Sequence, residues 1–284
     1  MRTPALLTLM AAWGNIVYSQ PTFEKFYDGI PSFKFNLTEM PDQNVLVGLG
    51  STRAISHLDP SGNVVYTHSY WAHPTELLTA PGGIRRYSNN EYVFAAGYKM
   101  TLDTCTSANP PNAYFHPVIG KMDVQGNLLD LRHYVLNEGC RNVAGDVVVT
   151  TDMGLVTWGY ERSFFAMKAD STLAPVWAKH FASNGGFQFI KELPGGDLLA
   201  GINMDTAGAV IARLDAAGNF IWCKSYFRPR GVVYDAVIES DSSFVITGYT
   251  DSTTTLVFTP LPADFHPKHF MMKLDGSGDV QWCK

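Results

Sequence analysis

Short apolar segments recur along most of the chain, and turn-forming residues separate them. Between Val210 and Leu214 every second residue is apolar and uncharged, as expected for a strand with one face buried. Several segments run into a glycine, and a turn rich in Pro, Asp, Asn, Gly or Ser precedes several of them. No stretch shows a helical period of useful length. The pattern therefore predicts an all-β protein made of antiparallel strands.

A longer pattern repeats within this alternation. An apolar strand ends in Leu-Asp or a similar pair, and then come two residues, Gly-Asn or Gly-Asp, and a strand that usually carries an aromatic residue. A degenerate copy around Asp170 lacks the glycine. The Asp side chain is expected to accept backbone hydrogen bonds, and Gly supplies the positive φ that such a hairpin requires. The four full copies place these structural turns at Asp59 and Gly62, Asp123 and Gly126, Asp215 and Gly218, and Asp275 and Gly278.

The repeats divide residues 20–284 into five units of roughly the size of one β-propeller blade, with four antiparallel strands each. Because a lone sheet cannot bury both of its faces, we expect the units to pack radially against one another. The prediction is a β-propeller of about five four-stranded blades, either complete or truncated from a larger propeller. A parallel β-solenoid and a β-sandwich pair are the alternatives. The approximate units are 20–66, 67–131, 132–177, 178–222 and 223–284.

These motifs resemble the blades of secreted propeller repeat proteins of Bacteroidetes-type bacteria. The shared pattern is Lys-Leu-Asp-x-x-Gly-Asn-x-x-Trp-x-Lys-x-Tyr, which the segment from Arg213 to Tyr226 follows closely. The resemblance covers residues 20–284. The spacing is also distantly similar to quinoprotein-like propeller repeats, although vicinal cysteines are missing here. The resemblance implies a scaffold without quinone chemistry, and we expect no cofactor.

The first 19 residues have the layout of a secretory signal peptide. A positive start at Arg2 precedes the apolar stretch from Ala5 to Trp13, and Ser19 offers a cleavage point before Gln20. The stretch is shorter than the ~20 residues that span a bilayer, and no later segment comes closer. We therefore expect a secreted or cell-surface protein, extracellular or periplasmic, without membrane insertion.

The charge of the chain limits the choice of partner. There are 21 basic and 26 acidic residues, the net charge is −5, and no run of like charge occurs. Because phosphate binding requires a basic face, nucleic acid is not expected as a partner.

Two units carry long insertions between their glycine strand and their Asp turn. The distance is 26 residues from Gly97 to Asp123 and 27 from Gly248 to Asp275, against 11, 11 and 14 in the other units. Both insertions contain Phe-His-Pro. Loops that grow on a fixed scaffold commonly carry binding sites. We therefore hypothesise that one face binds a ligand through Tyr114, His116, Asp264, His266 and His269.

Blander interpretations of the same residues stay open. The Phe-His-Pro triplets suit the start of a strand, where proline is tolerated. Asp264, His266 and His269 are residue types that bind metals, but they lack the spacing of two ligands on one helix face, so we expect no metal site.

Cys105 and Cys140 lie in loops of adjacent units and are candidates for a disulfide, which the environment of an exported protein permits.

The sequence favours a non-catalytic binding propeller, because no nucleophile motif and no paired carboxylates stand out. The predicted ligand is an unidentified protein or glycan at the cell surface. The alternatives are an extracellular carbohydrate-active enzyme on the same scaffold and a structural repeat segment of a larger exported protein.

Overall fold

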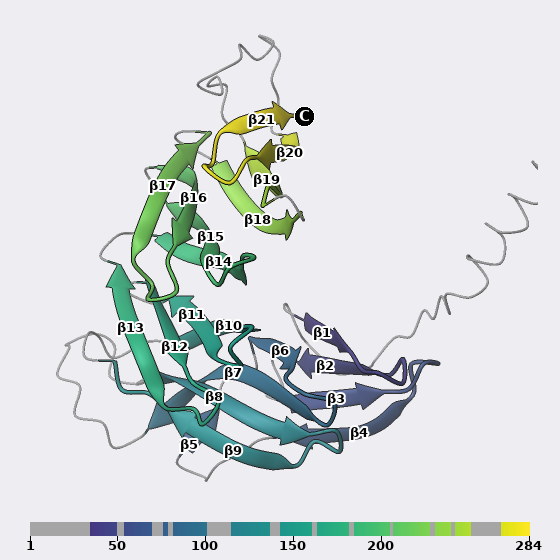
Figure 1. Cartoon of the computed structure of the whole chain (residues 1–284). Helices are drawn as coiled ribbons and strands as arrows, with labels where there is room; N and C mark the ends of the chain where they lie inside the picture. The colour runs from purple at the N-terminus through teal and green to yellow at the C-terminus, as the bar shows by residue number, and fades with distance from the viewer. Residues whose placement is uncertain are drawn as a thin grey trace, which may run out of the picture.

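The computed structural model describes residues 35–49, 54–69, 76–78, 82–100, 115–136, 143–160, 164–181, 185–204, 207–227, 231–239, 242–250 and 268–284. These ranges form 21 β-strands and contain no helix. The strands are grouped in five antiparallel sheets (Figure 1). The predicted all-β class is confirmed. The predicted signal peptide, residues 1–19, lies outside the described residues.

Each sheet is one blade, numbered here along the chain. Blade 1 consists of β1 (Phe35–Glu39), β2 (Val45–Leu49), β3 (Ala54–Leu58) and β4 (Val64–Ser69). Blade 2 consists of β5 (Glu76–Leu78), β6 (Gly83–Arg86), β7 (Glu91–Met100), β8 (Phe115–Asp123) and β9 (Leu128–His133). In blade 2, β5 and β6 pair with different parts of β7, so together they take the place of a single first strand.

The remaining blades have four consecutive strands, paired in chain order. Blade 3 consists of β10 (Val143–Val149), β11 (Leu155–Tyr160), β12 (Phe164–Ala169) and β13 (Pro175–Phe181). Blade 4 consists of β14 (Gly185–Glu192), β15 (Leu198–Met204), β16 (Gly208–Leu214) and β17 (Phe220–Tyr226). Blade 5 consists of β18 (Gly231–Ile238), β19 (Phe244–Thr250), β20 (Lys268–Leu274) and β21 (Val280–Cys283).

The five blades follow one another around an arc, with blade 1 and blade 5 at its two ends (Figure 1). First strands such as β10 and β14 lie on the inner side of the arc, and fourth strands such as β13 and β17 lie on the outer rim (Figure 1). This is the radial arrangement of a β-propeller, with five blades as predicted.

The burial of each strand follows from its place in the blade. The third strands β3, β12 and β16 are buried at nearly every residue, and β12, which has a neighbouring blade on each face, is buried throughout. In β20, the third strand of the terminal blade 5, buried and exposed residues alternate from His269 to Met272. The outer strand β4 is mostly exposed. Four apolar cores each join two consecutive blades; the one between blades 4 and 5 contains Phe189, Phe227 and Phe270. Each blade thus removes its neighbour's apolar face from water, and this burial stabilises the propeller.

The Asp turns between third and fourth strands share one geometry. In the turn of blade 4, the Asp215 carboxylate accepts the backbone N–H of Ala217 at 2.9 Å and of Asn219 at 2.8 Å, and the Asn219 amide at 3.0 Å. The hydrogen bond from the Asn219 side chain is the main cause that holds the pKa of Asp215 below its ordinary value. The turns at Asp59 and Asp123 repeat these three bonds.

Glycine is needed in these turns for two reasons. Gly62, Gly126, Gly218 and Gly278 have φ between 76° and 82°, the left-handed region that a side chain disfavours. Three of them also touch an aromatic ring of the preceding blade; a Cβ on Gly278 would lie 2.8 Å from the Trp222 ring. In the degenerate turn, Leu173 takes the same position with φ of 62°.

The fourth strands of blades 1, 3 and 4 are each joined to the turn of the next blade by an aromatic side chain. The Trp222 indole N–H donates to the Gly276 carbonyl at 3.3 Å, and the Trp177 indole N–H donates to the Ala216 carbonyl at 2.9 Å. In blade 1 the hydroxyl of Tyr66 donates to the equivalent carbonyl at 3.0 Å, and burial raises the pKa of Tyr66 to about 12. The repeated Trp or Tyr therefore fixes the position of one blade against the next.

Candidate functional site

The five predicted ligand-binding residues are only partly described. Tyr114, Asp264 and His266 lie outside the described residues, as do residues 101–114 and 251–267 of the two insertions. The candidate disulfide partners Cys105 and Cys140 lie outside them too. The other two predicted residues are His116 and His269. Cys223 and Cys283 are free thiols.

His116 lies in β8 and is only 5% exposed. It pairs across the sheet with Tyr98 of β7. His116, Val118 and Met122 lie on the same face of β8, and Met122 packs in the apolar core between blades 1 and 2. His116 is therefore placed on the blade 2 face that points toward blade 1, in the packed interior.

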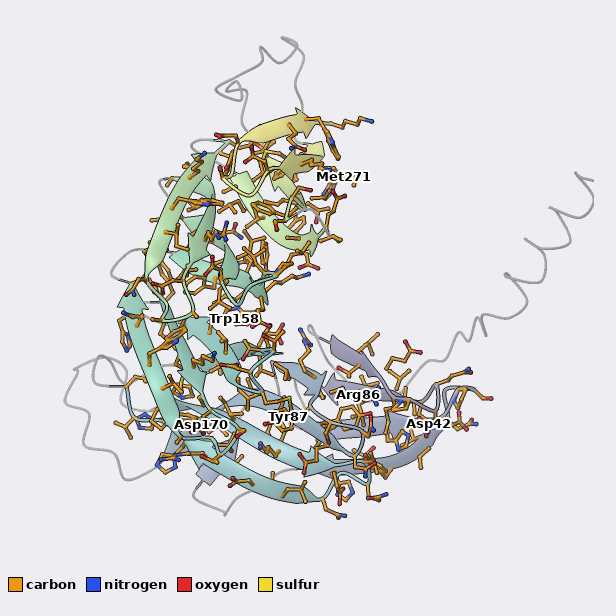
Figure 2. All side chains as sticks on the ribbon, viewed as in Figure 1. Asp42, Arg86, Tyr87, Trp158, Asp170 and Met271 are labelled. Carbon is orange, nitrogen blue, oxygen red and sulfur yellow. The ribbon has the colours of Figure 1, made fainter. Side chains whose placement is uncertain are left out.

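His269 lies in β20 and is exposed. Its neighbours Phe270 and Met272 pack in the core shared with blade 4, so the alternation of the strand turns His269 to the opposite face. Met271 is 50% exposed next to it (Figure 2). His116 and His269 thus occupy different environments, one packed against a neighbouring blade and the other open to solvent.

Two tyrosines complete a cluster around His269. The Tyr249 ring centroid lies 5.8 Å from that of His269, and the Tyr234 centroid lies 6.1 Å from it. Tyr234 is 50% exposed, and Tyr249 pairs directly with His269 across the sheet. We call Tyr234, Tyr249 and His269 the blade 5 aromatic surface. Strand β19 leads from this surface into the insertion, and β20 leads out of it.

Sequence reasoning selected His269 but missed both tyrosines. Tyr249 directly follows Gly248 at the start of the insertion, a signal that was present in the sequence. No feature of the sequence near Tyr234 points to a binding site, because this residue lies in the first strand of the blade, away from the insertion. It is the residue added at a β-bulge between Val233 and Asp235, and only the fold brings it to His269.

The carboxylates in the described part of blade 5 all have partners. Three pair with lysines and one accepts the backbone N–H groups of its own turn. The pairs are Asp235 with Lys191 at 2.8 Å, Glu239 with Lys273 at 2.6 Å, and Asp279 with Lys224 at 2.6 Å, and the turn residue is Asp275. Among all described residues, no group of three or more metal-ligating side chains comes together.

Ion pairs also link first strands of successive blades. Arg85 of β6 bonds Asp146 of β10 at 2.7 Å, and Lys191 of β14 bonds Asp235 of β18 at 2.8 Å. Both aspartates follow a β-bulge in their strand. Each pair joins the first strands of two successive blades.

No family model and no curated protein matches this chain. It is similar to a solved protein of unknown function from Bacteroides caccae, with 8% identity over 92% of this chain and 83% of that one, and a TM-score of 0.56. A protein of unknown function from Dyadobacter fermentans has 12% identity, coverage of 86% and 79%, and a TM-score of 0.52. A virginiamycin B lyase from Staphylococcus aureus has 12% identity, coverage of 87% and 82%, and a TM-score of 0.46. At such identities the likeness concerns the fold alone.

In the described part of the chain, no helix has the length and the apolar character that crossing a membrane requires.

Proposed function

We propose that this chain is a non-catalytic binding propeller, exported to the cell surface, that holds a glycan on the blade 5 aromatic surface and the adjoining insertion. The observation that carries the proposal is the exposure of Tyr234, with two further rings beside it and no apolar core of the described residues over them. An exposed aromatic ring offers an apolar face to the C–H side of a sugar, while phenol and imidazole groups hydrogen-bond its hydroxyls.

A binding role suits this surface better than glycoside hydrolysis. Hydrolysis requires two carboxyl groups, one as a general acid and one as a base or nucleophile. Asp235, the carboxylate next to Tyr234, is bonded to Lys191 of blade 4. The tyrosines and the histidine supply hydrogen-bond donors and apolar area, which are the requirements of recognition.

A glycan and polysaccharide array on the purified chain tests the proposal, with released sugars monitored in parallel. We expect binding of one glycan class without release of sugar. Replacement of Tyr234 by Ala should weaken that binding by about tenfold, because the ring supplies stacking and apolar burial.

The matched control is Phe220→Ala. Phe220 is 46% exposed on blade 4 and belongs to a different sheet, so its loss should leave glycan affinity unchanged. Equal losses in both variants, absence of any bound glycan, or sugar release at an appreciable rate would each overturn the proposal.

A further inference from the structure

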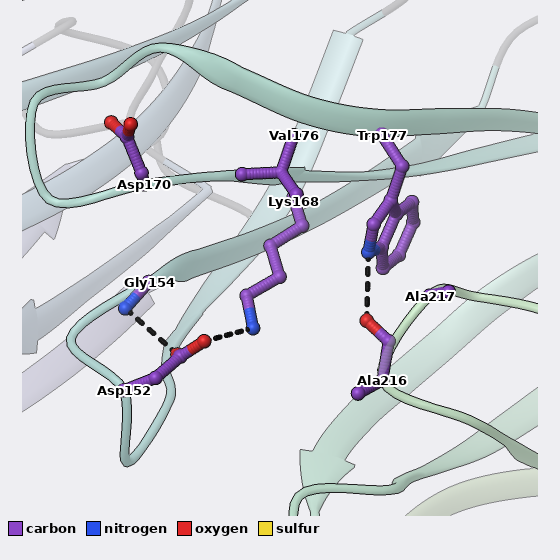
Figure 3. A pocket seen from close by; sticks show the side chains of 8 residues that line it. All are labelled: Asp152, Gly154, Lys168, Asp170, Val176, Trp177, Ala216 and Ala217. Atoms are coloured by element: carbon purple, nitrogen blue, oxygen red, sulfur yellow. Dashed lines mark hydrogen bonds and ion pairs between the residues drawn. The ribbon is translucent and has the colours of Figure 1, made fainter.

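A pocket of about 470 Å³ lies where blade 3 meets blade 4, at the end of the sheets that carries the Asp turns (Figure 3). Asp152 comes from the turn between β10 and β11, Lys168 from β12, and Trp177 from β13. Ala216 and Ala217, from the turn between β16 and β17, form the wall on the side of blade 4. None of these residues belongs to the blade 5 aromatic surface.

The equivalent place between blades 4 and 5 is filled by an arginine. Arg213 pairs with Trp222 across the sheet, as Lys168 pairs with Trp177. The Arg213 guanidinium donates to Asp197 at 2.9 and 2.7 Å, and at 3.2 Å to the Gly276 carbonyl. The Trp222 indole donates to the same carbonyl. One turn carbonyl therefore accepts two donors, one of them from a guanidinium.

In the pocket between blades 3 and 4, the turn carbonyl accepts one donor among the described contacts, not two. The Ala216 carbonyl accepts the Trp177 indole at 2.9 Å. Lys168 turns away from this carbonyl and bonds Asp152 at 2.6 Å, within its own blade (Figure 3). The space taken by the Arg213 guanidinium at one junction is thus open at the other.

A glycine keeps the path of Lys168 clear. A Cβ on Gly154 would lie 2.6 Å from Cε of Lys168 and 2.9 Å from the Thr150 hydroxyl. In blade 4 the equivalent turn position holds Asp197, the partner of Arg213. The acidic residue of the blade 3 turn, Asp152, therefore stands two positions before the place that Asp197 holds in blade 4. The basic residue of each blade bonds the acidic residue of its own turn, Lys168 to Asp152 and Arg213 to Asp197.

The charge of the pocket favours a cation. The hydrogen bond from Lys168 is the first cause that lowers the pKa of Asp152 to about 2, and the hydroxyl of Thr172 lowers the pKa of Asp170. Both carboxylates are ionised at neutral pH, whereas Lys168 supplies the one cationic group of the lining, so the lining side chains carry one net negative charge. Asp152 bonds the Lys168 ammonium, and the Asp170 carboxylate accepts hydrogen bonds within its own turn. The Trp177 ring adds an aromatic wall, on which a planar cation can stack.

We propose that this pocket binds a guanidinium group, as found in an arginine side chain or a free guanidine. Its N–H groups donate to the Ala216 carbonyl and to the Asp152 carboxylate, and its plane lies against Trp177. The planar fork of a guanidinium can donate to two acceptors at once, whereas an ammonium group is a compact point charge. Lys168 illustrates this limit, because its ammonium bonds the carboxylate without reaching the carbonyl.

Titration of the chain with methylguanidinium tests the proposal, with the indole N–H signal of Trp177 followed by NMR and assigned through Trp177→Phe. We expect saturable shifts with a Kd on the order of 1 mM, as suits so small a ligand. Methylammonium should bind at least tenfold more weakly. Acetyl-arginine-amide distinguishes the sources: tighter binding assigns the pocket to arginine side chains, and equal binding assigns it to free guanidinium compounds.

The decisive variant is Lys168→Arg, which places a guanidinium of the chain itself in the pocket. It should reduce methylguanidinium affinity at least tenfold, while the other indole signals report an unchanged fold. The matched control, Lys273→Arg, makes the same change in blade 5, where Lys273 pairs with Glu239, and should keep the affinity within twofold. Absence of saturation, equal binding of methylammonium, or unchanged affinity in folded Lys168→Arg would overturn the proposal.

Discussion

The junction between blades 3 and 4 and the junction between blades 4 and 5 are built on the same plan. In both, a tryptophan of the fourth strand donates to a turn carbonyl and packs on the turn glycine of the next blade, Trp177 on Gly218 and Trp222 on Gly278. In both, a lysine two residues further along reaches the last residue of that turn, at 2.8 Å and 2.6 Å. The two junctions differ only beside this shared contact.

The difference is a basic residue and the place of its acidic partner. Arg213 bridges Asp197 to the next blade, so its junction is filled. Lys168 bonds Asp152 within its own blade, so its junction keeps a pocket. The contact between tryptophan and turn holds each blade against the next, and the basic residue beside it differs between the two junctions, Lys168 in one and Arg213 in the other. A repeat can therefore acquire a pocket at one junction without disturbing the fold.

The largest expected effect comes from breaking the shared contact. Gly278→Ala forces a side chain into the left-handed region, at φ of 80°, and into the Trp222 ring. We expect a loss of about 3 kcal/mol of unfolding free energy, from backbone strain and overpacking together. Urea denaturation measures it.

Gly196→Ala is the matched control for this change. Gly196 has φ of 89°, but a Cβ there would meet no atom within 4 Å. Only the backbone term remains, so the loss should be about 1 kcal/mol. If both variants lost the same amount, the close approach of glycine and tryptophan would not contribute to stability.

Exchanging the two basic residues should change stability in opposite directions. Arg213→Lys keeps a cation beside Asp197 but gives up the bond to the Gly276 carbonyl, which should cost about 1 kcal/mol. Lys168→Arg can gain the equivalent bond to the Ala216 carbonyl, so its unfolding free energy should be unchanged or slightly higher. Thermal or urea unfolding of the two variants measures the signs. A loss in both would show that the junctions are not equivalent.

The smallest expected effect is the pH dependence of the Lys168–Asp152 pair. The folded-state pKa of Asp152 is about 2, below its ordinary value of 3.8, chiefly because of the hydrogen bond from Lys168. The pair therefore stabilises the fold above about pH 4, and this stabilisation is lost as the pH falls toward 2. The Asp152 side chain is 61% exposed, so we expect only ~0.5 kcal/mol.

Asp152→Asn removes this ionisation. The difference in stability between the original chain and this variant should shrink as the pH falls from 4 to 2, when both are followed by urea denaturation. A difference that stayed constant over that range would show that the charge of Asp152 does not stabilise the fold.

The repeat units predicted the propeller because their physics is local. The turn that contains Asp215 and Gly218 is held by hydrogen bonds between residues at most four positions apart. The motif therefore predicts a hairpin wherever it occurs in the sequence. The site was harder to predict. His269 stood out beside an insertion, whereas Tyr234 comes from another strand and meets His269 only after the sheet forms.

The class of fold, the number of blades and the place of the Asp turns follow from the order of residues along the chain, since strand alternation and turn chemistry depend on near neighbours. The partner that each basic residue takes depends on how the strands and blades pack. Lys168 and Arg213 stand at the same position of their repeats, yet one bonds within its blade and the other also bonds the next blade. The Lys168 contact forms once its own sheet is folded, whereas the contact of Arg213 with Gly276 joins residues 63 positions apart and exists only after two blades have packed.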